Sequence, residues 1–235
     1  MYFFRFPVSQ GKRKNYKYAR EAIQLETAWA DNTSSKSMKE KTAGAKNTKI
    51  DGTSCKNITV TGNRFINMPC GVGQHHYTKN GKYRNDNITI SDNKFSCSNS
   101  MKYCKTAITC SGMNDLSVVN NTISGSYRFG IHVIASDRVS IRDNQIEKTS
   151  LNGIMIDSGK INDISSNTVK NTGKNGISVS GGSVKEVSKN IVQTVKQNGI
   201  CINSGTVTDI NNNTVKDCKK HGIAIGGGAL QRNRI

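Results

Sequence analysis

The sequence predicts an all-β solenoid, a parallel β-helix, and three observations support this. A six-residue frame returns along the chain: apolar, two free positions, Asn, one free position, apolar. From Asn121 to Asn213 the Asn of this frame recurs every 23 residues, and a column of small-then-branched-apolar residues keeps the same step. Such a fixed period indicates repeats that bury their apolar faces only by stacking on one another. The eight copies of the frame are Val60–Phe65, Ile90–Phe95, Val118–Ile123, Ile141–Ile146, Ile164–Val169, Val187–Val192, Ile210–Val215 and Leu230–Ile235.

Each repeat is expected to form two or three short strands separated by sharp bends. The stretches Gly176–Ser180 and Gly199–Asn203 alternate with period two, as half-buried strands do. The leucine spacing of leucine-rich repeats is absent. Successive turns then stack in parallel about 4.8 Å apart, with equivalent residues above one another. We therefore expect the Asn column to form a ladder of side-chain amides.

Asn-Gly pairs mark the corner before one strand of each turn, at Asn152-Gly153, Asn175-Gly176 and Asn198-Gly199. Because both residue types tolerate positive φ, we expect these corners to use it. His221 replaces the Asn of this pair one repeat later, so a structural role at the corner is the prediction for it.

The repeat is regular only in the C-terminal half. Ala22 to Gly71 is 49 residues and Gly71 to Ala107 is 36, whereas no excess occurs from Ala107 onward. We expect one β-helix domain over 1–235, with a loop-rich groove region at 1–106 and regular scaffold turns at 107–235. The last frame stops at Ile235 without a cap, so we expect the chain to be part of a longer protein. The inserted loops, which should wall a groove, cover about 27–53, 75–86 and 96–105.

The alternation also predicts which side chains face this groove. Residues one and three positions past the small residue should point inward, such as Ile131 and Val133, and those two and four past it should point outward. Glu26 and His75 then lie at the same outward position on adjacent turns, where they suit general acid–base chemistry. A solvated surface pair is the alternative for them. His132 is an outward residue two turns further along.

Charge is the second functional signal. Lys and Arg number 34 against 16 acidic residues, a formal net charge of +18. Basic clusters at 12–20, 36–49 and 79–84 should attract anionic ligands such as acidic polysaccharides. Sparse aromatic interleaving disfavours nucleic acid, and a basic surface that only aids solubility is the alternative.

The seven cysteines have no metal-ligand spacing, so we expect no metal or other cofactor, with a calcium requirement left open. Cys97 and Cys104 flank a loop and are a candidate disulfide. No transmembrane run is present, and we expect a monomer that does not bind membranes.

Several segments resemble bacterial right-handed parallel β-helix proteins of the pectate-lyase-like superfamily. The resemblance rests on Glu21–Glu26, Asp51–Ile58, Gly71–His75 and Gly81–Tyr83, although Glu26 stands where the family usually has Asp. It implies a single-stranded right-handed β-helix at the cell surface or outside the cell, acting on polysaccharides as a lyase, hydrolase or epimerase. No residue set defining one activity maps onto the chain, so the reaction type stays open.

The leading hypothesis is a carbohydrate-active β-helix that acts on an acidic polysaccharide. In a lyase or epimerase, His75 is the candidate base, a cation neutralises the uronate carboxylate and a tyrosine protonates the leaving oxygen. In a hydrolase, Glu26 acts with Glu21 or Asp51. The alternative is a non-catalytic glycan-binding or adhesive surface solenoid. The candidate substrate-binding residues are Gln24, His76, Tyr77, Lys79, Tyr83, Tyr103, Lys105, Arg128 and His132.

Overall fold

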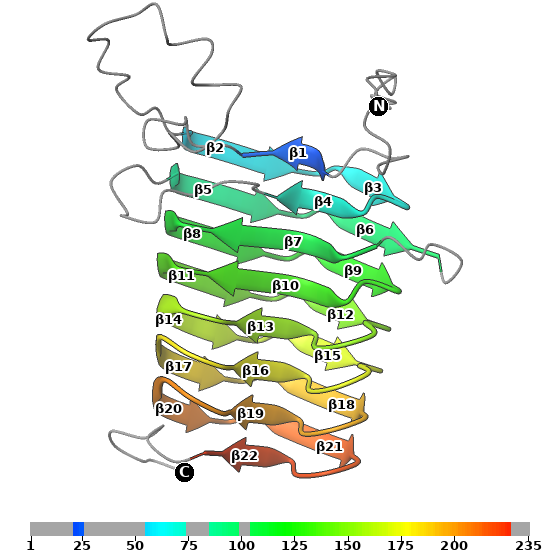
Figure 1. The fold of residues 1–235 in the computed structure, drawn as a ribbon, viewed down its shortest axis with the longest axis vertical. Helices are drawn as coiled ribbons and strands as arrows, with labels where there is room; N and C mark the ends of the chain where they lie inside the picture. The colour runs from blue at the N-terminus through cyan, green and yellow to red at the C-terminus, as the bar shows by residue number, and fades with distance from the viewer. Residues whose placement is uncertain (1–20, 26–54, 74–84, 99–103, 227–235) are drawn as a thin grey trace, which may run out of the picture.

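The computed structural model is a right-handed, single-stranded parallel β-helix, as the repeat predicts (Figure 1). It describes residues 21–25, 55–73, 85–98 and 104–226. Every regular element in these ranges is a short β-strand, and the strands form three parallel sheets. The same ranges contain no helix that is long and apolar enough to cross a membrane.

Sheet A holds the strand that follows the small residue of each repeat, and eight strands contribute to it. Its members lie one above another along the axis in Figure 1. They are β1 (Glu21–Gln24), β4 (Cys70–Gly73), β7 (Thr106–Ser111), β10 (Phe129–Ile134), β13 (Ile154–Ile156), β16 (Ile177–Val179), β19 (Ile200–Ile202) and β22 (Ile223–Ile225).

Sheets B and C hold the two strands on either side of the frame Asn, with seven strands each. Sheet B consists of β2 (Lys56–Thr61), β5 (Asn85–Ser91), β8 (Met113–Val119), β11 (Ser136–Arg142), β14 (Gly159–Ser165), β17 (Ser183–Ser188) and β20 (Thr206–Asn211). Sheet C consists of β3 (Arg64–Ile66), β6 (Lys94–Cys97), β9 (Thr122–Gly125), β12 (Gln145–Glu147), β15 (Thr168–Lys170), β18 (Ile191–Val195) and β21 (Thr214–Cys218).

The core fills the space between the three sheets, and the register confirms the predicted step. Ile131 pairs with Ile154, Ile154 with Ile177, and Ile177 with Ile200. All four side chains are fully buried, as is the predicted inward residue Val133. Stacked β-branched residues therefore form continuous apolar columns, because every turn repeats the same inward positions.

The longer N-terminal turns also follow the predicted arithmetic. Val72 pairs with Ile108, which is 36 residues later, and Glu21 pairs with Cys70, which is 49 residues later. Some outward positions of sheet A behave differently from their prediction, and Ser111 is the first example. Ser111 is only 3% exposed, so it is covered although it occupies an outward column.

The predicted Asn ladder is confirmed at the corner between sheets B and C. Asn121, Asn144, Asn167 and Asn190 are each fully buried. Each side-chain Oδ1 accepts the backbone N–H and the Nδ2 of the Asn one turn before it, at 3.0–3.1 Å. Each Nδ2 also donates to a backbone carbonyl of the preceding turn. The buried amides are thus paired, which removes the cost of burying them.

The prediction that the Asn-Gly corners use positive φ is wrong. Neither the asparagines nor the glycines of Asn152-Gly153, Asn175-Gly176 and Asn198-Gly199 have positive φ. The glycine is required by space instead, because a Cβ on Gly153 would lie 2.3 Å from a methyl of Val169 and 2.8 Å from the Gly176 carbonyl oxygen. Positive φ occurs elsewhere, for example at Asp143, Ser166 and Lys189, each just before a ladder Asn.

The corner asparagines form a second, shorter ladder. The Oδ1 atoms of Asn152, Asn175 and Asn198 accept the backbone N–H of the equivalent residue one turn later, at 3.0–3.1 Å. In the last case the donor is the backbone of His221, so that residue occupies the corner column as predicted. The corner is held by the asparagine side chains and made possible by the missing Cβ of the glycines.

The candidate pair Cys97 and Cys104 forms a disulfide, with a Cα–Cα distance of 6.6 Å. Both cysteines are 4% exposed. The bridge joins the end of β6 to the residues just before β7, and so closes the inserted loop at its base. Disulfides of this kind persist in oxidising compartments outside the cytoplasm.

Candidate functional site

Most residues of the predicted groove lie outside the described part of the chain. Lys105, Arg128 and His132 are described in full, whereas Glu21 and Gln24 belong to β1 and are described by their backbone alone. The proximity of the acid–base pair therefore stays a prediction. The candidates outside the described residues are Glu26, Asp51, His75, His76, Tyr77, Lys79, Tyr83 and Tyr103.

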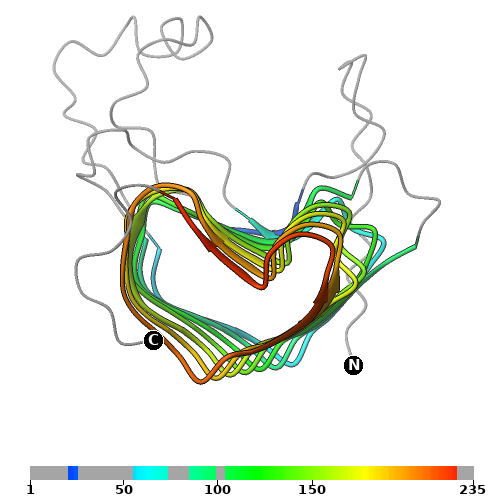
Figure 2. The same ribbon diagram turned by 90° about the horizontal axis from the view of Figure 1, so that it is seen from below.

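Viewed along its axis, the solenoid has an indented cross-section (Figure 2). The indentation lies where the loops that leave sheet C turn into sheet A. Ser178 and Cys201 point outward from sheet A, between inward residues of the core, yet they are only 2% and 4% exposed. Asn198 of the corner column reaches Cys201 from the side, since its Nδ2 donates to Cys201 Sγ at 3.4 Å. The outer face of sheet A is therefore sheltered although it lies outside the core.

On this face two successive turns bring an aromatic ring, an imidazole and a carboxylate together: Phe129 and His132 lie in β10, and Asp157 follows β13 of the next turn. The rings of Phe129 and His132 have centroids 4.9 Å apart, tilted by 39°. His132 Nε2 lies 2.6 Å from Asp157 Oδ2, and the two side chains are 16% and 39% exposed. The guanidinium of Arg128 lies over the Phe129 ring, 5.9 Å from its centroid. We call these four residues the sheet A cluster.

A line of cations runs beside the indentation, in the loops between sheets C and A. The backbone hydrogen bonds place Lys105, Arg128, Leu151 and Lys174 one above another on successive turns. Successive turns of a parallel stack are about 4.8 Å apart. None of the cations in this line makes an ion pair with a described residue. The line, here called the basic ridge, comprises the exposed residues Lys105, Arg128, Lys174, Lys196, Lys219 and Lys220.

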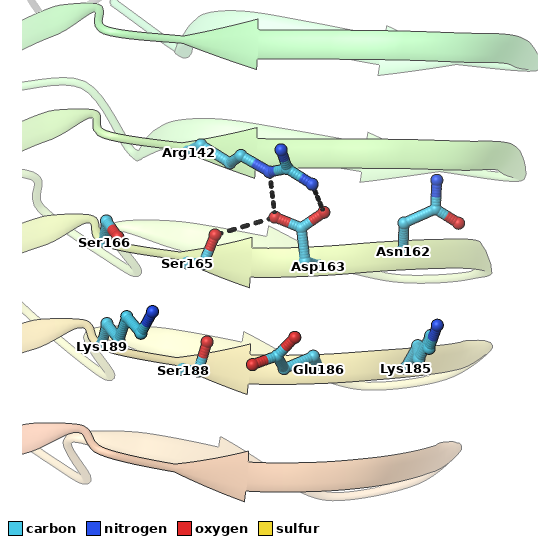
Figure 3. Close-up of a pocket in the computed structure, with 9 residues that line it drawn as sticks. All are labelled: Arg142, Asn162, Asp163, Ser165, Ser166, Lys185, Glu186, Ser188 and Lys189. Carbon is cyan, nitrogen blue, oxygen red and sulfur yellow. Dashed lines mark hydrogen bonds and ion pairs between the residues drawn. The ribbon is translucent and has the colours of Figure 1, made fainter.

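A shallow pocket of about 290 Å³ lies on sheet B (Figure 3). At its centre Arg142 donates to both carboxylate oxygens of Asp163, at 2.5 and 2.6 Å, while Ser140 and Ser165 donate at 2.8 Å. Lys185 and Lys189 line the same pocket. Because Arg142 and Asp163 satisfy each other, the centre of the pocket is a structural ion pair that leaves little free capacity for a ligand.

The Asp163 carboxylate gives a pH-dependent prediction. Burial alone raises the pKa of Asp163, but the hydrogen bonds from Arg142, Ser165 and Ser140 outweigh it, so the pKa lies below its ordinary value. A carboxylate with a lowered pKa in the folded state stabilises the fold above its unfolded pKa, and this contribution is lost as the pH falls. Asp163→Asn should therefore flatten the decline in the free energy of unfolding as the pH falls from about 5 through the folded pKa.

Urea unfolding at several pH values measures this effect. Asp209→Asn is the matched control, because Asp209 lies in the same outward column but makes no hydrogen bond with a described residue. An acid profile that is equally steep in the wild type and in Asp163→Asn would contradict the assigned role.

Sequence reasoning missed two members of the sheet A cluster, Phe129 and Asp157. A signal was present for Phe129, since it stands at the corner position that Asn152, Asn175 and Asn198 occupy in later turns. A residue that departs from a regular repeat is one whose type the scaffold does not dictate, so it is a candidate for a functional role. No comparable signal marked Asp157, because its partner His132 comes from the preceding turn.

The fold defines the class of this protein as a parallel β-helix repeat protein, built from 23-residue turns with an amide ladder inside. A family model described as "NosD: Periplasmic copper-binding protein (NosD)" matches residues 97–235. This is more than half of the chain, so the chain belongs to the NosD family. Searches of the curated proteins and of the solved structures found no match. The more specific resemblance to the pectate-lyase-like superfamily stays a prediction.

Proposed function

We propose that this chain is an exported, non-catalytic solenoid that binds an acidic polysaccharide along its basic ridge. The observation that carries the proposal is the ridge itself, in which exposed Lys and Arg side chains follow one edge of a rigid stack and form no ion pair with any residue that the structure describes. Cations at intervals of one or two turns suit an extended polyanion that runs parallel to the solenoid axis. The formal net charge of +18 adds a long-range attraction to such a ligand.

Export is supported in two ways. The family that matches the chain is described as periplasmic. The disulfide between Cys97 and Cys104 also suits an oxidising compartment. An acidic polysaccharide of a cell envelope or of the surroundings is a ligand that an exported protein would meet.

The catalytic alternative needs other residues. A lyase, hydrolase or epimerase reaction was assigned to His75, Glu26, Glu21 and Asp51, and none of these side chains is described. The ridge, by contrast, lies mostly on regular turns of the scaffold. The ridge is the candidate site that the described residues present, and it supports binding, while the catalytic assignment stays a prediction.

Copper binding is the property named for the family. Copper takes Cys, His and Met ligands, usually two to four together. Among the described residues, no three His, Cys, Asp or Glu side chains lie close enough to hold a metal ion. His132 and Met155 are neighbours on paired strands, but His132 Nε2 is bonded to Asp157 and Met155 Sδ accepts the Asn152 amide at 3.2 Å. The described residues thus offer no group of three such ligands to copper.

The test is retention on immobilised polygalacturonate, eluted with a salt gradient. Reversing three ridge charges with Lys174→Glu, Lys196→Glu and Lys220→Glu should weaken binding about tenfold or more at moderate salt, because each attractive contact becomes repulsive. Retention of the wild type should fall steeply with salt, since exposed ion pairs are screened.

The matched control reverses Lys56, Lys94 and Lys160, which are exposed on sheets B and C and change the net charge by the same amount. It should keep most of the retention. Equal losses in both variants would show that net charge alone is responsible and would contradict a role for the ridge. Analysis of the eluted polysaccharide by mass spectrometry serves as a second readout, and shortened products would overturn the non-catalytic part of the proposal.

A further inference from the structure

One turn of the regular half departs from the repeat at the edge of the indentation. The corner column runs through Phe129, Asn152, Asn175 and Asn198 on successive turns. In the three later turns the asparagine Oδ1 accepts the backbone N–H of the equivalent residue one turn on, which is Asn175, Asn198 or His221. These hydrogen bonds hold successive turns together. Phe129 has no such capacity, and it is half-exposed rather than packed into the core. Phe129 therefore does not form the capping hydrogen bond that the asparagines of this column make.

The neighbours of Phe129 on the same face are also unusual for the repeat. His132 takes the outward position that is Met155, Ser178 and Cys201 in the following turns. The contact between His132 Nε2 and Asp157, at 2.6 Å, fixes the orientation of the imidazole. Nδ1 of His132 and Oδ1 of Asp157 make no hydrogen bond with a described residue. Two polar atoms are thus left available beside a partly exposed aromatic ring.

These groups match the surface of one sugar unit. An aromatic ring face is electron-rich and attracts the C–H edges of an apolar surface, such as one face of a pyranose. The imidazole and the carboxylate can donate to and accept from ring hydroxyls. Arg128, exposed at the same place and part of the basic ridge, offers a planar guanidinium that suits a carboxylate.

We propose that the sheet A cluster of Arg128, Phe129, His132 and Asp157 is the subsite that recognises a single uronic acid unit within the bound polysaccharide. This rests on the proposed function, since the ridge supplies the general attraction for the polyanion. The cluster adds specificity: Phe129 packs against the sugar ring, His132 and Asp157 bind its hydroxyls, and Arg128 pairs with its carboxylate. The subsite lies where the regular turns begin.

The repeat itself supplies a conservative variant for the test. Phe129→Asn installs the residue of the following turns, whose Oδ1 would accept the Asn152 backbone N–H as Asn152 Oδ1 accepts that of Asn175. The fold should therefore be preserved, which urea unfolding checks. His132→Ser, the residue of the same column at Ser178, is the second variant. Cys201→Ser, three turns along that column, is the matched control.

Isothermal titration with a short oligogalacturonate measures the effect. We expect Phe129→Asn to lower the affinity about tenfold, the scale of one aromatic contact, and His132→Ser to lower it as well. Cys201→Ser should bind like the wild type. The methyl ester of the same oligosaccharide should bind the wild type more weakly, because it lacks the carboxylate that Arg128 would pair with.

The outcomes separate the two proposals. If the wild type binds and Phe129→Asn binds equally well, the subsite is overturned while binding along the ridge stands. If the methyl ester binds as tightly as the acid, the subsite does not recognise a uronic acid. If the folded wild type binds neither polygalacturonate nor its oligosaccharide, the proposed function fails and the subsite fails with it.

Discussion

Asn167→Ala is expected to lower the free energy of unfolding by about 4 kcal/mol, because it leaves several buried polar groups without partners. Asn167 is fully buried. Its Nδ2 donates to the Ile141 carbonyl at 2.9 Å and to Asn190 Oδ1 at 3.0 Å. Its Oδ1 accepts the backbone N–H and the Nδ2 of Asn144, both at 3.0 Å. The substitution thus interrupts the ladder in both directions.

Urea unfolding followed by circular dichroism measures this loss. Asn162→Ala is the matched control, since Asn162 is exposed on β14, the strand just before Asn167. A surface substitution of this kind should change the free energy of unfolding by less than about 0.5 kcal/mol. Asn167 lies in a central turn, so unfolding from either end of the solenoid has to pass through it. Similar losses in the two variants would mean that the ladder does not stabilise the stack.

Ile177→Ala is expected to cost about 2–5 kcal/mol through the cavity left by the lost methyl and methylene groups. Ile177 lies in β16, is fully buried, and stacks on Ile154 and Ile200 of the neighbouring turns. Because the turns above and below also press on this position, the backbone cannot collapse freely into the space. The same urea experiment gives the value.

Ile191→Ala is the matched control, because it removes the same atoms from an outward-facing isoleucine on another strand. Ile191 begins β18 and is 42% exposed, so its loss should cost well under half as much as that of Ile177. Comparable costs at the two positions would contradict the assignment of inward and outward faces. Such a result would mean that the strand register is shifted by one residue, which exchanges the faces.

Much of the fold was readable from the sequence because a solenoid repeats one local environment. The step between Asn121 and Asn213 predicted both the stacking register and the amide ladder, and the pairs in sheets A and C follow it. The longer steps before Ala107 also predicted where the turns are extended. A period fixes which residues meet, since stacking places equivalents above one another.

The candidate site was harder to predict, because its members do not recur. Lys105, Arg128 and His132 were singled out from charge and residue type, yet the partners that define their surroundings were not. Phe129 touches His132 within one strand, whereas Asp157 reaches it from the next turn. The residue type at Asp157 carries no sign of this contact. Only the register between β10 and the turn that follows brings the two side chains together.

The sequence by itself determined the architecture of this protein: the parallel β-helix, its 23-residue turn, its inward apolar columns and its amide ladder. The tertiary structure alone decided the shape of the outer surface. The indentation beside sheet A arises from the path of the loops, and the glycines of Asn152-Gly153 and its equivalents are needed there for space rather than for positive φ. The physical reason is that periodicity specifies contacts between equivalent residues, while a binding surface depends on contacts between residues that are not equivalent.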